Sequence, residues 1–122
     1  MSESLKAAIL KDAKTFAMKG RCVSAFARDA DNNTVRPTSV DAVTWCVAGA
    51  VQRAIGFDEI YYMYSDQGGT EQTHRLYREI IEMLRSYTNP MAVGGWNDRP
   101  ERTLEEIGGL FDSVIAMQGV NV

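Results

Sequence analysis

Residues 41 to 56, DAVTWCVAGAVQRAIG, decide the fold. Apolar or small side chains recur there at the spacing of one helix face, namely at Val43, Cys46, Val47, Ala50, Val51 and Ala54. Most other positions are also apolar or small, and a helix that is apolar nearly all round is buried among several neighbours. The stretch predicts a buried central helix over about 41–55. Its N-cap lies among Thr38, Ser39 and Asp41, and Gly56 ends it.

Gly49 lies inside this predicted helix. A glycine there costs about 1 kcal/mol relative to alanine. The usual compensation is a neighbouring backbone that approaches closely where the side chain is missing. We therefore expect close packing against Gly49.

Composition indicates an ordinary globular protein of one helical domain, residues 1–122. Hydrophobic residues make up 45% and charged residues 24% of the chain, which argues against disorder. The net charge is −3 with no basic run, so a nucleic-acid partner is not expected. No apolar run approaches transmembrane length, and no signal peptide opens the chain, so no membrane association is expected. Two cysteines only, one in the central helix, favour reduced thiols in the cytoplasm.

Periodicity and capping signals place the other elements around the central helix. Thr103 and Glu106 form a capping-box pattern, which predicts the start of the last helix. Turn residues between two short runs predict a small hairpin, whose second arm Pro37 confines to an edge. We expect helices over 2–19, 71–87 and from 103 onward, a short helix after Asp58, a hairpin-like insertion over about 21–38, and an irregular segment over 91–102. The fold class is mainly α: a compact bundle of four main helices around the central one.

Three phrases together resemble an uncharacterised family of small bacterial and phage proteins, classed only as a domain of unknown function. They are Ala25-Phe-Ala-Arg-Asp29, Trp45-Cys-Val-Ala-Gly-Ala50, and Trp96-Asn-Asp98 followed by Arg102-Thr103. The resemblance covers roughly residues 20 to 116. It implies a compact intracellular protein encoded by phage or mobile elements, and it implies no activity.

One enzymatic alternative uses Cys46, His74 and Asp98 or Asn97, which follow the chain order of several thiol hydrolases. Such chemistry needs a thiolate that an imidazole activates and a carboxylate or amide orients. The predicted helix start favours the thiolate. However, Cys46 shares an apolar face on which an inert buried thiol is the common outcome.

Metal binding is not expected. One histidine and two distant cysteines give no ligand spacing. The oxygen-rich cluster at Asp29, Asp31, Asn32 and Asn33 lacks the glycine and distal glutamate of a calcium loop, so a plain turn is favoured. No cofactor is expected either.

The most polar segment surrounds Trp96, Asn97 and Asp98. Its structural interpretation has Trp96 filling the core while Asn97 and Asp98 form Asx turns ahead of the last helix. In the functional interpretation, Trp96, Arg99 and Arg102 form a pocket rim for an anionic or planar ligand. The structural interpretation is favoured, and both remain open at this level.

Tyr61, Tyr62, Met63 and Tyr64 form a second candidate surface, because adjacent helical positions cannot all face the core. Tyrosine and methionine are enriched at protein contacts. We therefore expect a non-enzymatic helical interaction module that binds a protein partner or forms a homodimer through this run. The alternative is the thiol hydrolase.

Overall fold

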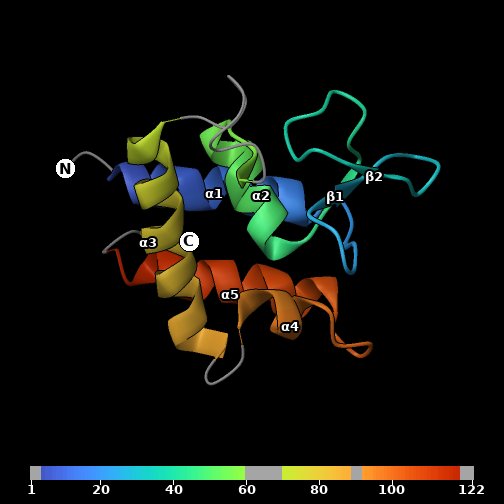
Figure 1. Cartoon of the computed structure of the whole chain (residues 1–122). Helices are drawn as coiled ribbons and strands as arrows, with labels where there is room; N and C mark the ends of the chain where they lie inside the picture. Colours follow the sequence, from blue (N-terminus) through green and yellow to red (C-terminus); the bar gives the residue numbers. More distant parts are fainter. Residues whose placement is uncertain (1–3, 60–69, 89–91, 119–122) are drawn as a thin grey trace.

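The computed structural model describes residues 4–59, 70–88 and 92–118. Its elements are α1 (Leu5–Ala17), β1 (Ala27–Arg28), β2 (Thr34–Val35), β3 (Thr44–Trp45), α2 (Val47–Ile55), α3 (Glu71–Thr88), α4 (Val93–Asn97) and α5 (Leu104–Ala116) (Figure 1). Four longer helices carry most of the structure, so the predicted mainly α fold is confirmed.

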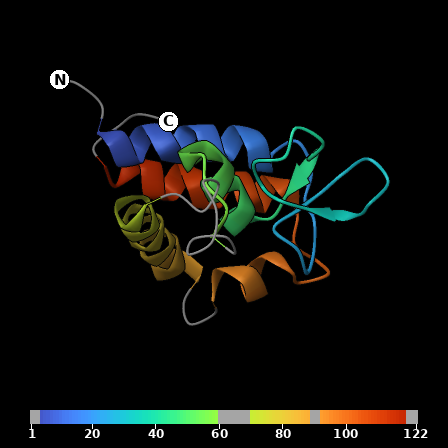
Figure 2. The ribbon, with the colours of Figure 1, turned by 45° about the horizontal axis from the view of Figure 1, so that its top comes forward.

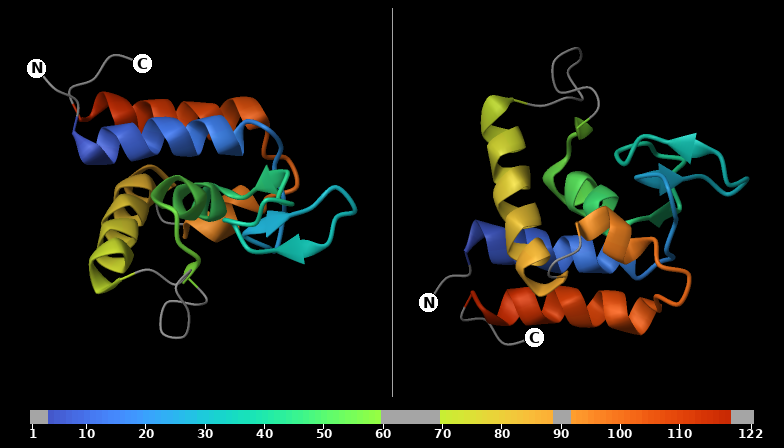
Figure 3. Two further views of the ribbon diagram at one scale, coloured as in Figure 1. Left: turned by 90° about the horizontal axis from the view of Figure 1, so that it is seen from above. Right: turned by 60° about the horizontal axis from the view of Figure 1, so that its bottom comes forward.

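The helices form two layers. Helices α1 and α5 lie side by side and run antiparallel, and α2 and α3 cross beneath them (Figures 2 and 3). The small sheet lies at the end of α1 where that helix finishes (Figure 1). Between the layers lies a core whose largest fully buried side chains include Phe57, Phe111, Leu10, Ile80 and Leu84.

Helix α2 is central, as predicted, but it begins later than expected. It packs against α1, α3 and α4, and all of Val47 to Gln52 is buried. Its C-terminus is Gly56, in the predicted left-handed conformation at φ 95°. The predicted start at about residue 41 is wrong, because the helix starts at Val47 with Cys46 as its N-cap. Val43, on the predicted buried stripe, is 45% exposed.

Residues 44 and 45 are a strand because their backbone pairs with β1. Trp45 is opposite Ala27 in an antiparallel register, and Thr44 is opposite Arg28. The Trp45 indole Nε1 donates a hydrogen bond of 2.9 Å to the Pro37 carbonyl, and its ring packs 5.1 Å from that of Phe16. The extended backbone at Trp45 thus places the indole where its N–H has an acceptor and its ring packs in the core.

The predicted hairpin is confirmed in β1 and β2, which pair antiparallel. The strand order β2-β1-β3 makes β2 an edge strand, as Pro37 predicts. Between them, Asp29 Oδ1 accepts the backbone N–H groups of Asp31 at 3.0 Å and of Asn33 at 2.8 Å. The acidic cluster is therefore built as a turn.

One further segment differs from expectation. The stretch expected to be irregular contains α4, a five-residue helix. The short helix expected after Asp58 falls almost wholly outside the described residues. Asp58 itself is fully buried, and its carboxylate accepts the backbone N–H of Thr38 at 3.1 Å and the hydroxyl of Thr38 at 2.7 Å. The carboxylate thus anchors the loop between β2 and β3 to the end of α2.

Side chains cap the first and the last helix at their N-termini. The first helix was expected over 2–19, but α1 begins at Leu5, where the Ser4 side chain accepts the N–H of Ala7. The predicted capping box of Thr103 with Glu106 is confirmed at the start of α5. None of the helices in the described part of the chain is long and apolar enough to span a membrane.

Candidate functional site

Asn97 connects three segments that are distant in sequence. It is fully buried at the end of α4. Its Oδ1 accepts the backbone N–H of Val47 at 3.1 Å, and its Nδ2 donates to the Cys22 carbonyl at 2.9 Å. The first amides of a helix have no partner within the helix, so this side chain supplies one for α2. The predicted Asx turn is replaced by long-range bonds.

Asp98 holds the neighbouring bend. Its Oδ2 accepts the backbone N–H of Ser24 at 3.1 Å, and its Oδ1 accepts Asn97 Nδ2 at 3.0 Å. Ser24 has φ 61°, a conformation that residues other than glycine adopt only when their surroundings impose it. Asn97 and Asp98 together therefore fix residues 22–24 against α2 and α4.

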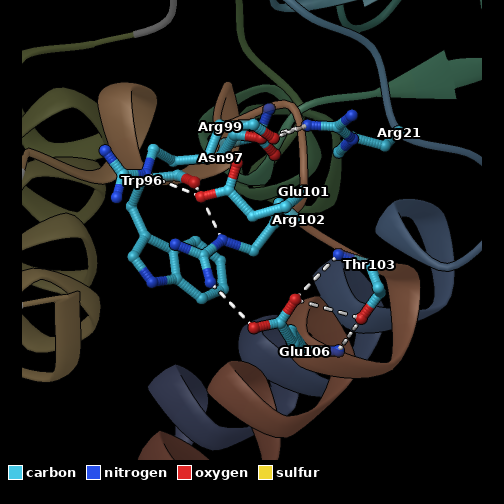
Figure 4. A network of polar contacts seen from close by, with 8 residues as sticks. All are labelled: Arg21, Trp96, Asn97, Arg99, Glu101, Arg102, Thr103 and Glu106. Atoms are coloured by element: carbon cyan, nitrogen blue, oxygen red, sulfur yellow. Dashed lines mark hydrogen bonds and ion pairs between the residues drawn. The ribbon is translucent and has the colours of Figure 1, made fainter.

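Trp96 and Arg102 contact each other (Figure 4). The guanidinium carbon lies 3.8 Å from the indole centroid, and Nε donates to the Trp96 carbonyl at 2.9 Å. Arg102 also pairs with Glu106 at 2.9 Å. The Thr103 backbone N–H, with further bonds from Thr103 and Arg102, holds the pKa of Glu106 below its usual value. Arg102 is thus committed to Trp96 and to the capping box.

The other arginines nearby are also engaged. Arg99 pairs with Glu101 at 3.1 Å. Arg21 donates to the carbonyls of Asn97 at 2.7 Å and Arg99 at 2.8 Å (Figure 4). These contacts favour the structural interpretation of residues 96–102 over an anion-binding rim.

Cys46 is the N-cap of α2 and is buried. Its sulfur accepts the backbone N–H of Gly49 at 3.3 Å. Burial raises the pKa of this thiol to about 12 and outweighs the opposing effect of the Gly49 hydrogen bond. Proximity to a helix start therefore does not produce a thiolate here, because the loss of hydration is the larger effect.

His74 lies in a different environment on α3. Its ring is 6.3 Å from that of Phe57 and 6.4 Å from that of Tyr77, measured between centroids. Cys46 instead clusters with Cys22 and Ala48. The structure brings Cys46 and Asp98 to one pocket but does not place His74 among the residues that line it.

That pocket has a volume of about 380 Å³ and lies over the start of α2. We call it the Phe26 pocket. Its lining residues are Ser24, Ala25, Phe26, Thr34, Cys46, Ala48, Gly94 and Asp98. Sequence reasoning singled out only Cys46 and Asp98, since the other six come from a bend, an edge strand and two helices that no local pattern brings together.

Two further predictions concern the aromatic run and metal binding. Tyr61, Tyr62 and Tyr64 lie outside the described residues, so the aromatic surface is not placed. Within residues 4–59, 70–88 and 92–118, no three His, Cys, Asp or Glu side chains are grouped to hold a metal ion.

Comparison with known proteins places the chain in a family of unknown function. A family model described as a family of unknown function (DUF6197) matches residues 1–117. Because the match covers nearly the whole chain, the chain belongs to that family. No curated protein and no solved structure matches. The predicted resemblance to a family of unknown function is confirmed, and the function has to be argued from the site.

Proposed function

We propose that this member of a family of unknown function is a non-enzymatic binding module whose ligand site is the Phe26 pocket. One observation carries the proposal: the pocket walls are held by long-range hydrogen bonds, and those of Asn97 are buried, so the pocket is preformed. Asn97 fixes the start of α2 that carries Ala48, and Asp98 fixes Ser24 on the opposite side. Preformed apolar pockets with a few polar groups are the usual form of a small-ligand site.

The chemistry of the lining favours binding over catalysis. The nucleophile of the alternative hydrolase would be Cys46, whose thiol stays protonated near neutral pH because burial raises its pKa. Its sulfur already serves as the cap of α2. The ring of the histidine that would activate it lies beside those of Phe57 and Tyr77. The thiol hydrolase therefore remains the weaker alternative.

We expect the protein to act in the cytoplasm, where its two buried thiols stay reduced. The implied origin in phage or mobile elements remains an expectation of the resemblance. A protein partner or a second copy, bound through the aromatic run at 61–64, is a separate prediction and does not depend on the pocket.

Two glycines provide a matched test of the site. Gly94 and Gly109 are both exposed helical residues at which an added Cβ meets nothing within 4 Å, but only Gly94 lines the pocket. In a fragment screen by ¹H–¹⁵N NMR, binders should shift the amides of residues 24–26, 46–48 and 94–98. Gly94→Leu should abolish these shifts, and Gly109→Leu should preserve them. Binders that persist in Gly94→Leu, or that shift none of these amides, would contradict the proposal.

A further inference from the structure

Given the binding function proposed above, on which this inference rests, we propose that the Phe26 pocket takes a small organic ammonium, a primary amine on a short apolar or aromatic body. Among the described residues that line it, Asp98 is the only charged one. The others contribute alkyl and aromatic groups, two hydroxyls and a thiol. The lining therefore complements a mostly apolar molecule with one cationic end.

The Asp98 carboxylate has capacity for such a ligand. A carboxylate only accepts hydrogen bonds and offers about four lone-pair positions. The two bonds it receives come from neutral donors, the Ser24 N–H and Asn97 Nδ2. Asp98 is half-buried, and it forms no ion pair with a basic side chain in the described part of the chain. An ammonium would supply the charge-assisted hydrogen bond that its protein neighbours do not.

Two basic side chains that contact residues at or beside the pocket donate to other acceptors. Arg28 donates to the carbonyls of Val23 at 3.0 Å and Asn32 at 3.0 Å, and Arg21 donates to those of Asn97 and Arg99. Neither hydrogen-bonds the Asp98 carboxylate. No cation among the described lining residues would offset the repulsion between that carboxylate and an anionic ligand. The Arg28 guanidinium donates to the hydroxyl of the lining residue Thr34 at 3.2 Å and so is engaged with the edge strand.

The size and lining of the pocket limit the apolar body. A volume of about 380 Å³ lies near the lower end of the usual range for ligand sites, so it suits a single ring or a short branched chain. Phe26 adds an aromatic side chain to the same lining, and aromatic rings favour cations over anions. A small arylalkylamine meets each of these conditions.

Three probes with a common phenylalkyl body test the charge preference: 2-phenylethylamine, 2-phenylethanol and 3-phenylpropionate. Titrations followed by ¹H–¹⁵N NMR at neutral pH should show the amine binding at least tenfold more tightly than the alcohol. The carboxylate should bind more weakly than either. Asp98→Asn should remove most of the advantage of the amine over the alcohol. The control Glu101→Gln changes the net charge equally in the neighbouring loop but lies outside the lining, and it should preserve the tenfold preference.

Asp98→Asn could also weaken binding by releasing Ser24, which Asp98 holds in place. A second variant therefore tests the charge without changing Asp98. Thr34→Lys places a cation on the edge strand at the pocket rim, where it should compete for Asp98 and weaken the amine alone. Equal affinity for amine and alcohol, or an amine preference that survives both variants, would overturn the ammonium inference. If the alcohol still binds there and Gly94→Leu removes it, the binding function stands without the ammonium. If no probe or fragment shifts the pocket amides, both proposals fail.

Discussion

Replacing Gly49 by alanine should strongly destabilise the protein, because the added methyl group meets a backbone atom. A Cβ at this position would lie 1.9 Å from the Phe26 carbonyl oxygen and 2.7 Å from its carbon. Helix α2 and the bend that contains Phe26 would have to separate by roughly 1 Å to relieve the overlap. The obstacle is main chain, so no side-chain rotation can remove it.

The magnitude follows from three contributions. Overpacking costs about 1–3 kcal/mol, and the top of that range applies because backbone must move. The Phe26 carbonyl also accepts the Cys46 N–H at 3.1 Å, and loss of that bond adds about 1 kcal/mol. Alanine returns about 1 kcal/mol through its higher helix propensity. The expected net loss is about 3 kcal/mol, which lowers the melting temperature by roughly 10 °C in a domain of this size.

Thermal and urea denaturation followed by circular dichroism measure this loss. Gly109→Ala is the matched control, because that helical glycine has open space around its added Cβ. It should be neutral or stabilise the protein by up to about 1 kcal/mol. A Gly49→Ala protein that melts within about 2 °C of the unsubstituted protein would refute the close approach of α2 to Phe26.

Five further outcomes are expected. Asn97→Ala leaves the Val47 N–H and the Cys22 carbonyl without their partner, and urea denaturation should show a loss of about 2–4 kcal/mol. Burial raises the pKa of Cys46, so stability that is complete below about pH 9 should decline as the pH rises toward 12, and Cys46→Ser should flatten that decline. At pH 8, mass spectrometry should find Cys46 unmodified by iodoacetamide in the folded protein. Rapid alkylation of Cys46 would instead support the thiol hydrolase hypothesis. Thr103→Ala should cost about 1 kcal/mol and reduce hydrogen-exchange protection over residues 104–107; equal protection would argue against the cap. Light scattering over a concentration series should show a dimer that Tyr62→Glu and Tyr64→Glu weaken, and a monomer at high concentration would exclude self-association through that run.

Local sequence patterns predicted the helices whose apolar spacing and capping residues lie within one segment of the chain. Helices α1, α3 and α5 follow the spacing of their apolar residues, and Thr103 with Glu106 marks the start of α5 because both partners lie in one turn. The close approach at Gly49 was also predictable, since a glycine in a buried helix needs a compensating contact. The identity of the approaching backbone, Phe26, was not.

The start of α2 was mispredicted because apolar periodicity does not distinguish a buried helix from a short strand that leads into one. Thr44 and Trp45 have high β-propensity, which was the available signal. The side chain that caps the helix is also uncommon in that role, since serine, threonine, aspartate and asparagine are preferred there and Cys46 fills it instead. Both features depend on β1, which supplies the pairing partner from residues 27–28.

The candidate site could not be predicted from the sequence, because it also depends on contacts between distant segments. The Asn97 side chain accepts the backbone N–H of Val47, fifty residues earlier, and the Asp98 carboxylate accepts the backbone N–H of Ser24. A side chain that satisfies a distant backbone group leaves no periodic trace in the sequence, because only one residue of each pair has to be polar. The Phe26 pocket exists between the segments that these bonds join, so its lining becomes recognisable only in the fold. Of the residues named from the sequence, Cys46 and Asp98 do line one pocket. The Cys46 sulfur caps α2 there, and both carboxylate oxygens of Asp98 accept one hydrogen bond each and keep lone pairs for a further donor, which supports the proposal of ligand binding over that of catalysis.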